Sequence, residues 1–135
     1  MKEETIRLNG KVFDQRNLID LKSDLNKGWQ NDIYYFLECW FNDSSVIITR
    51  TSGSTGEPKE IRLAKQAMRN SAKMTNAFFG LTESKTALLC LPALYIAGKM
   101  MLVRAIVGGF NLITVEPKAN PFENVSIPIW YGLNI

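Results

Sequence analysis

Residues 46–63 read VIITRTSGSTGEPKEIRL, and this stretch carries the clearest structural signal in the chain. The apolar, β-branched residues 46–49 predict a buried strand. A run of small, hydroxyl and turn-forming residues follows from Thr51 to Lys59, and residues 60–63 read as a short extended piece. A loop that leaves a buried strand lies at the edge of the sheet where α/β proteins usually bind ligands.

The loop from Thr51 to Lys59 is predicted to bind phosphate. Its glycines free the backbone to approach an anion closely, and successive amide N–H groups can then form an anion nest. The predicted phosphate-binding residues are Thr51, Ser52, Gly53, Ser54, Thr55, Gly56 and Lys59. The order is not that of the nucleoside triphosphatase P-loop, because Glu57 and Pro58 separate Gly56 from Lys59. The alternative is a plain surface loop, since Ser, Gly and Thr are common in loops.

Composition excludes several classes of function. The chain has 135 residues, 46% hydrophobic and 21% charged, as expected for one globular domain. It has no histidine, which excludes Ser-His-Asp and Cys-His catalysis and every zinc site that contains histidine. Cys39 and Cys90 are too far apart in sequence to suggest a metal site, so none is expected. The net charge of +3 is scattered, so no nucleic-acid partner is expected.

The rest of the chain predicts alternating strands and helices. Hydrophobic spacing predicts several helices, and glycines 28, 80 and 108–109 are expected to end them. Residues 33–41 carry an aromatic stripe, which is typical of a helix that faces the core. The helices are expected over residues 17–26, 33–41, 64–79 and 96–107, and the strands over 11–13, 46–49, 60–63, 86–91 and 111–115. This pattern predicts an α/β fold with a mostly parallel sheet and flanking helices. Residues 1–117 form the expected domain, and 118–135 an irregular tail.

Two motifs resemble those of the AMP-forming acyl-CoA synthetase family. The loop resembles the signature T-S-G-[ST]-T-G-x-P-K-G, with Glu60 in place of the final glycine. Residues 91–98, LPALYIAG, resemble the next segment of the family, L-P-[LM]-[FY]-H-x-x-G, with Tyr95 in place of the histidine. The resemblance implies that residues 1–117 are part of the N-terminal, nucleotide-binding domain of an adenylate-forming enzyme. It implies ATP, Mg²⁺ and coenzyme A as cofactors or co-substrates.

The segment from Gly98 through Arg104 to Gly109 is similar to the branch that activates o-succinylbenzoate in menaquinone biosynthesis. In that branch an arginine follows the glycine on the same helix. The resemblance implies an acyl-substrate pocket lined by Tyr95, Gly98, Lys99 and Arg104. Lys99 or Arg104 would pair with a carboxylate of the substrate. Alternatively, each belongs to a solvated helix face or to a structural ion pair.

The family reaction is a ligation in two steps. A carboxylate attacks the α-phosphate of ATP, pyrophosphate leaves, and coenzyme A then displaces AMP from the acyl-adenylate. The family's adenine-binding segment, ribose-binding Asp and catalytic lysine are not found here, so catalytic residues are expected beyond residue 135 and the chain alone is expected to be inactive. A cytoplasmic location, no membrane span and self-association through exposed sheet edges are also expected. Three alternatives stay open: a non-catalytic nucleotide- or phosphate-binding module, a plain interaction domain, and another member of the superfamily such as a fatty acyl-CoA synthetase.

Overall fold

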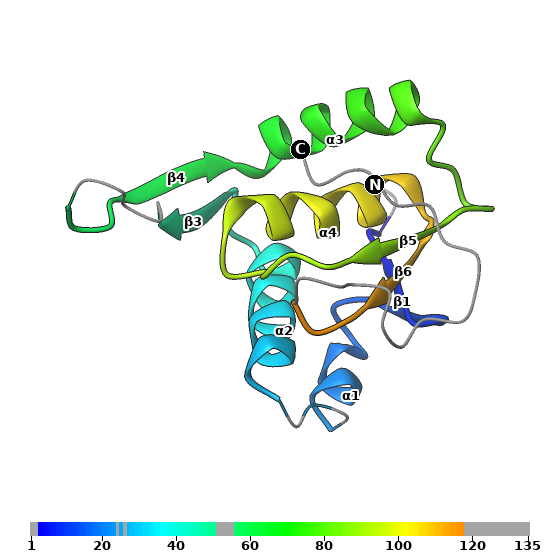
Figure 1. The fold of residues 1–135 in the computed structure, drawn as a ribbon, viewed down its shortest axis with the longest axis horizontal. Coiled ribbons are helices and arrows are strands. Elements are labelled where there is room, and N and C mark those ends of the chain that lie inside the picture. Colours follow the sequence, from blue (N-terminus) through cyan, green and yellow to red (C-terminus); the bar gives the residue numbers. More distant parts are fainter. Residues whose placement is uncertain (1–2, 24, 26, 51–55, 118–135) are drawn as a thin grey trace.

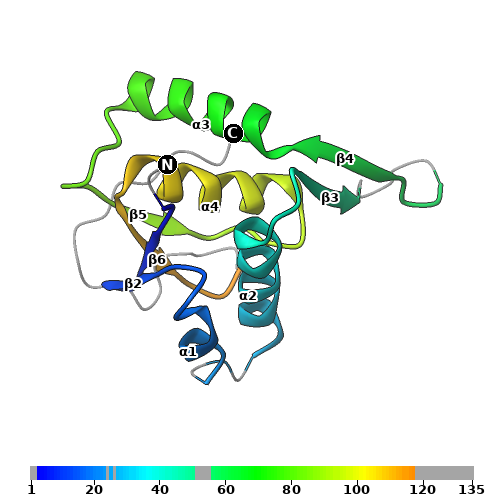
Figure 2. The ribbon, with the colours of Figure 1, turned by 180° about the vertical axis from the view of Figure 1, so that it is seen from behind.

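The computed structural model describes residues 3–23, 25, 27–50 and 56–117. The expected tail, residues 118–135, and most of the loop, residues 51–55, lie outside the described part. Figures 1 and 2 show the arrangement of the described elements from two opposite sides. Among these elements, every helix is too short or too polar to cross a bilayer.

The main sheet has four strands in the order β2-β1-β6-β5. These are β2 (Lys11–Phe13), β1 (Ile6–Leu8), β6 (Asn111–Thr114) and β5 (Thr86–Leu89). β6 pairs in parallel with both β1 and β5, while β1 and β2 pair antiparallel. The predicted α/β class with a mostly parallel sheet is therefore confirmed. β5 ends the sheet within the described residues, and self-association through its outer edge stays a prediction.

The sequence analysis did not predict β1. A tight turn at Asn9 and Gly10, with φ of 50° and 84°, joins β1 to β2. Asn and Gly tolerate positive φ, and the pair is a strong hairpin signal. The Asn9 side chain also continues the sheet, since its Nδ2 donates to Thr114 Oγ1 and its Oδ1 accepts from the Thr114 N–H, both at 3.0 Å. The turn thereby ties the N-terminal hairpin to the carboxyl end of β6.

Four helices accompany the strands: α1 (Leu18–Lys22), α2 (Gly28–Phe41), α3 (Lys65–Phe79) and α4 (Ile96–Gly108). The predicted helix over 17–26 is wrong at its end, because α1 stops at Lys22 and Ser23 Oγ donates to the Asp20 carbonyl at 2.8 Å. Gly28 begins α2 instead of ending the preceding helix. Gly80 and Gly109 end α3 and α4 as predicted, with left-handed φ of 67° and 75°.

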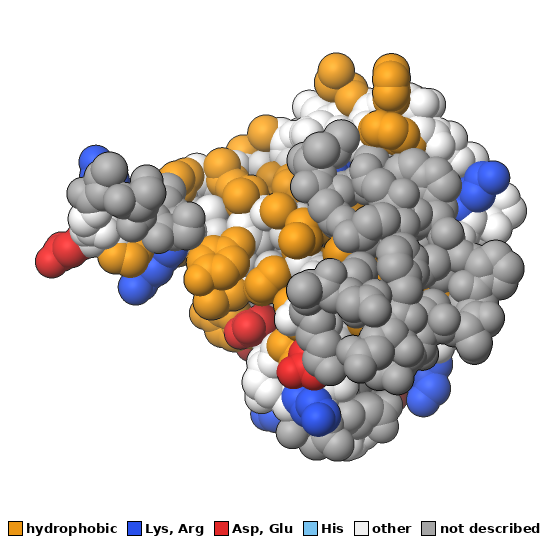
Figure 3. All heavy atoms as spheres, in the orientation of Figure 1, with side chains coloured by type: hydrophobic (Ala, Val, Ile, Leu, Met, Phe, Trp, Pro, Cys, Tyr) orange, Lys and Arg blue, Asp and Glu red, His pale blue; other side chains and the backbone are white. Residues whose placement is uncertain are grey.

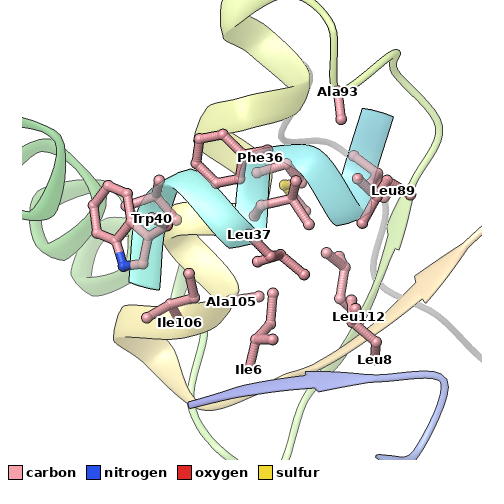
Figure 4. Packing of buried hydrophobic residues seen from close by; sticks show 14 of the residues in the cluster. Ile6, Leu8, Phe36, Leu37, Trp40, Leu89, Ala93, Ala105, Ile106 and Leu112 are labelled. Atoms are coloured by element: carbon pink, nitrogen blue, oxygen red, sulfur yellow. The ribbon is translucent and has the colours of Figure 1, made fainter. Parts of the chain in front are cut away.

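α4 lies between the sheet and α3, and α2 packs beside it (Figure 1). Figure 4 shows Phe36, Leu37 and Trp40 of α2 packed among side chains of α4 and the sheet. Leu37 is fully buried, and Phe36 and Trp40 are each only 2% exposed. The aromatic stripe predicted on residues 33–41 is therefore part of the core.

In the described part of the chain, β3 (Val46–Arg50) and β4 (Glu60–Ala64) form a second, separate sheet, paired antiparallel from Val46↔Ala64 to Arg50↔Glu60. The expectation that residues 46–49 belong to the parallel sheet is wrong. Parallel pairing of successive strands needs a crossover of about a dozen residues or more, whereas only residues 51–59 separate β3 from β4. The resulting hairpin projects from the body of the molecule (Figures 1 and 2).

The buried position of α4 predicts a large stability effect. Leu102 on α4 is fully buried, so Leu102→Ala should lower the free energy of unfolding by about 2–5 kcal/mol through lost contacts and a cavity. Met74→Ala on α3 is the matched control, because Met74 is 75% exposed and should change little. Urea denaturation followed by circular dichroism measures both. Equal effects of the two variants would contradict the packing described for α4.

Candidate functional site

The phosphate-loop candidate sits at the far end of the β3–β4 hairpin. Thr51, Ser52, Gly53, Ser54 and Thr55 lie outside the described residues, so their predicted role in phosphate binding stays a prediction. In the described part of the loop, Gly56 has a φ of +143°, a backbone conformation that favours glycine. A Cβ at Gly56 would meet nothing within 4 Å, so the glycine serves the backbone conformation there and not close packing. Lys59 is exposed and begins the return to β4.

An open cleft of about 740 Å³ lies beside this hairpin. Its walls come from α2, from β3, and from the turn that precedes α4. The lining side chains include Asp32, Tyr35, Phe36, Cys39, Ile47, Ile48, Thr49, Arg50, Pro58, Glu60, Ala93, Leu94, Tyr95 and Lys99. Pro58 belongs to the loop itself, so the loop and the cleft adjoin.

The rim of the cleft is apolar and exposed. Tyr35, Ile48, Leu94 and Tyr95 are between 44% and 66% exposed. Figure 3 shows hydrophobic side chains gathered between the hairpin and the body of the molecule. An apolar cleft with a few polar groups is the usual form of a small-molecule site.

Lys99 is the buried basic group of the cleft, only 8% exposed. Its Nζ donates to the carbonyl oxygens of Ala93, at 2.9 Å, and Leu94. Burial lowers the pKa of the Lys99 ammonium, and the nearby Asp32 carboxylate opposes this shift. Two of its three donors thus hold the turn that carries Leu94 and Tyr95, and the third has no acceptor among the described residues.

The other predicted pocket residues divide into two groups. Tyr95 precedes α4 at the rim of the cleft, while Gly98 lies behind the turn, packed against Pro92. Arg104 is also on α4 and is buried, but it does not line the cleft. Burial lowers the pKa of its guanidinium. Direct contact between Arg104 and a substrate therefore stays a prediction.

The sequence analysis missed the contribution of α2. Asp32, Tyr35 and Cys39 face the cleft, although none of them occupies positions 33, 36, 37, 40 or 41, which form the predicted stripe. Thr49 on β3 was also missed as a site residue, and its buried hydroxyl has no hydrogen-bond partner among the described residues. No periodic signal marks these residues, because the cleft exists only once α2, β3 and the 93–95 turn come together.

The described residues contain no candidate metal-binding site. Nowhere between residues 3 and 117, outside the undescribed positions, do three His, Cys, Asp or Glu side chains gather in a way that could hold a metal ion. Within the described residues, neither Cys39 nor Cys90 forms a disulfide bond.

Three comparisons relate the chain to known proteins. No protein-family profile matches it. Oxalate–CoA ligase from Arabidopsis thaliana is 29% identical over 81 residues, which cover 60% of this chain and 16% of that ligase. An acyl-CoA synthetase (AMP-forming)/AMP-acid ligase II-like protein from Dyadobacter fermentans superposes with a TM-score of 0.69 at 37% identity, over 75% of this chain and 29% of that protein.

An o-succinylbenzoate coenzyme A synthetase from Bacillus subtilis, in complex with AMP, matches with a TM-score of 0.49 at 26% identity, over 53% of this chain and 19% of that one. By their names, the sequence relative is a CoA ligase, the Dyadobacter protein is similar to AMP-forming acyl-CoA synthetases, and the Bacillus protein is a coenzyme A synthetase. The α/β fold matches the corresponding domain of the Dyadobacter protein. The chain spans less than a third of the length of each of these proteins.

Gly98 offers a test of how the cleft wall is built. A Cβ at this position would lie 2.1 Å from the Pro92 carbonyl oxygen, so Gly98→Ala must displace the 92–95 turn and should lower the free energy of unfolding by about 1–3 kcal/mol. Gly28→Ala is the control, because nothing lies within 4 Å of its Cβ. It should be neutral or slightly stabilising at the start of α2. Thermal unfolding of both variants is the measurement, and an unperturbed Gly98→Ala protein would refute the close approach.

Proposed function

We propose that this chain is part of an AMP-forming acid–thiol ligase. In this role the loop from Thr51 to Lys59 binds the β- and γ-phosphates of ATP, and the neighbouring cleft binds the carboxylic acid. The observation that carries the proposal is the adjacency of the two: Pro58 and Glu60 at the end of the loop also line the cleft. The 37% identity to the Dyadobacter protein supports the same assignment.

The adenylation step joins the two sites. The carboxylate oxygen of the acid attacks the α-phosphorus of ATP, the α–β phosphoanhydride bond breaks, and pyrophosphate leaves with its negative charge. Catalysis of this step is mostly positioning and charge neutralisation. Amide N–H groups of the loop, its hydroxyls and the Lys59 ammonium supply donors for the departing pyrophosphate. Mg²⁺ bound with ATP would supply further neutralisation of the phosphate charge.

The second step and the remaining contacts need more protein. A coenzyme A thiol would displace AMP from the acyl-adenylate to give the thioester. In this proposal the groups that bind adenine and ribose, and the catalytic lysine, come from sequence outside these 135 residues. The 135-residue chain alone is then inactive in ligation, although it carries phosphate- and acid-binding parts.

We further propose o-succinylbenzoate as the acid. This substrate has two carboxylates, so one can react while the other is held. Lys99 lies in the cleft with one donor beyond those used by Ala93 and Leu94, and it is the cation best placed to hold the second carboxylate. Arg104, which carries the resemblance to this branch, is buried on the same helix as Lys99 but does not line the cleft. A fatty acid would need no such cation.

Lys59→Ala tests the phosphate-binding role. Loss of a charged hydrogen bond, worth about 1.5–3 kcal/mol, should weaken MgATP binding at least about tenfold. Lys73→Ala is the matched control, since Lys73 is exposed on α3. Isothermal titration calorimetry gives both affinities. The same affinity for MgATP in all three proteins would exclude the loop as the phosphate site.

Lys99→Met tests the choice of acid. Binding of o-succinylbenzoate should weaken about tenfold or more, because one charge-assisted contact is lost. Benzoate has a single carboxylate and controls for displacement of the 93–95 turn, so its affinity should change much less. Titration of each acid into both proteins gives the two ratios. Equal losses for the two acids would assign Lys99 a structural role only, and tighter binding of a long-chain fatty acid would favour that branch of the family.

A further inference from the structure

Lys65 is a buried cation at the junction of three elements. It is the first residue of α3, directly after β4, and it is only 3% exposed. Its Nζ donates to the Trp40 carbonyl at 2.9 Å, and to the carbonyl and side-chain oxygens of Asn42 at 3.2 and 2.9 Å. All three donors of the ammonium are therefore used on the end of α2.

These contacts complete a helix end that has no cap of its own. The last carbonyls of a helix lack partners within the helix and carry the negative end of its dipole. α2 has no basic residue in its last turn, so Lys65 supplies the cation from a distant part of the chain. Burial, and then the nearby charge of Arg69, lower the pKa of the Lys65 ammonium. A buried ammonium is costly unless it is hydrogen-bonded, as it is here.

The same junction holds the base of the β3–β4 hairpin. The Lys65 backbone N–H donates to the Ser45 carbonyl at 2.9 Å, one residue before β3 begins. Arg69, one turn along α3, lies over the Trp40 ring at 4.9 Å and forms an ion pair with Glu4 at 2.8 Å. The end of α2, the base of the hairpin and the start of α3 are thus joined around one ammonium.

The hairpin needs such an attachment. Its two strands pair only with each other in the described structure, and a two-stranded hairpin alone is marginally stable. Its contacts with the body come from its buried face, where Ile47 and Thr49 are 2% and 6% exposed, and from its base. Strands of five residues make an arm of about 17 Å, so a tilt of ten degrees at the base would move the tip by about 3 Å.

We propose that Lys65 is a positioning residue for the phosphate loop. By fixing the base of the hairpin on the end of α2, its ammonium sets where the tip stands relative to the cleft that α2 also lines. The ligand of the loop rests on the proposed function, whereas the attachment of the hairpin does not. Lys65 touches no substrate in this proposal, and its effect passes entirely through the hairpin.

The test compares Lys65→Met with Lys73→Met, an exposed position on the same helix. Hydrogen exchange measured by mass spectrometry compares the exchange rates of the backbone amides in β3 and β4 with those in β5 and β6. Lys65→Met should speed exchange in the hairpin at least about tenfold while β5 and β6 change little, and it should weaken MgATP binding. Lys65→Arg keeps a charged donor and should recover part of both effects.

Other outcomes would overturn the proposal. Equal acceleration in the hairpin and in the main sheet would show that Lys65 only stabilises the whole fold. An unchanged hairpin, or a mobile hairpin with unchanged MgATP affinity, would also refute it. Should Lys65→Met fail to fold, Asn42→Ala removes one acceptor of the ammonium and should give a smaller effect of the same pattern. Failure of the wild-type chain to bind MgATP, with hairpin-selective exchange intact, would count against the proposed function and not against the attachment.

Discussion

The rest of the structure depends on the burial of α4 on almost every side. Met101, Leu102, Val103 and Ala105 are at most 1% exposed, because the sheet covers one face of the helix and α3 covers the opposite one. A helix enclosed in this way leaves little room for its two cations, so Lys99 and Arg104 are buried with it. The turn before α4 takes its position from the same packing. The wall of the cleft is therefore set by the hydrophobic core and not by the surface.

The sequence predicted the regular elements well and their arrangement less well. Helices α3 and α4 follow from hydrophobic spacing and from the glycines at their ends, and the core face of α2 follows from spacing alone, since both signals are local. The pairing of β3 with β4 was missed, because a β-branched run has the same composition in a parallel sheet and in a hairpin. β1 is too short for periodicity to detect, although the Asn9-Gly10 pair carried the signal for its turn.

In the candidate site too, local motifs could be predicted from the sequence, whereas residues brought together by tertiary packing could not. The motif residues from Gly56 to Lys59 and from Tyr95 to Lys99 could be recognised because they are contiguous in sequence. The α2 wall of the cleft could not, since Asp32, Tyr35 and Cys39 meet the other residues only through tertiary packing. Lys65 is a further case: its sequence context is that of a solvated helix start, and only the fold brings it to the end of α2.

The separation of the hairpin from the main sheet has an evolutionary consequence. Residues 57–60 near its tip are exposed and contribute little to the core, so most replacements there leave the free energy of folding nearly unchanged. Ligand preference at the tip can then diverge, or be lost, on a scaffold that selection retains for stability. Variation in a central strand would instead have to preserve packing on two faces at once. The end of the β3–β4 hairpin can therefore change in sequence more freely than the strands of the main sheet.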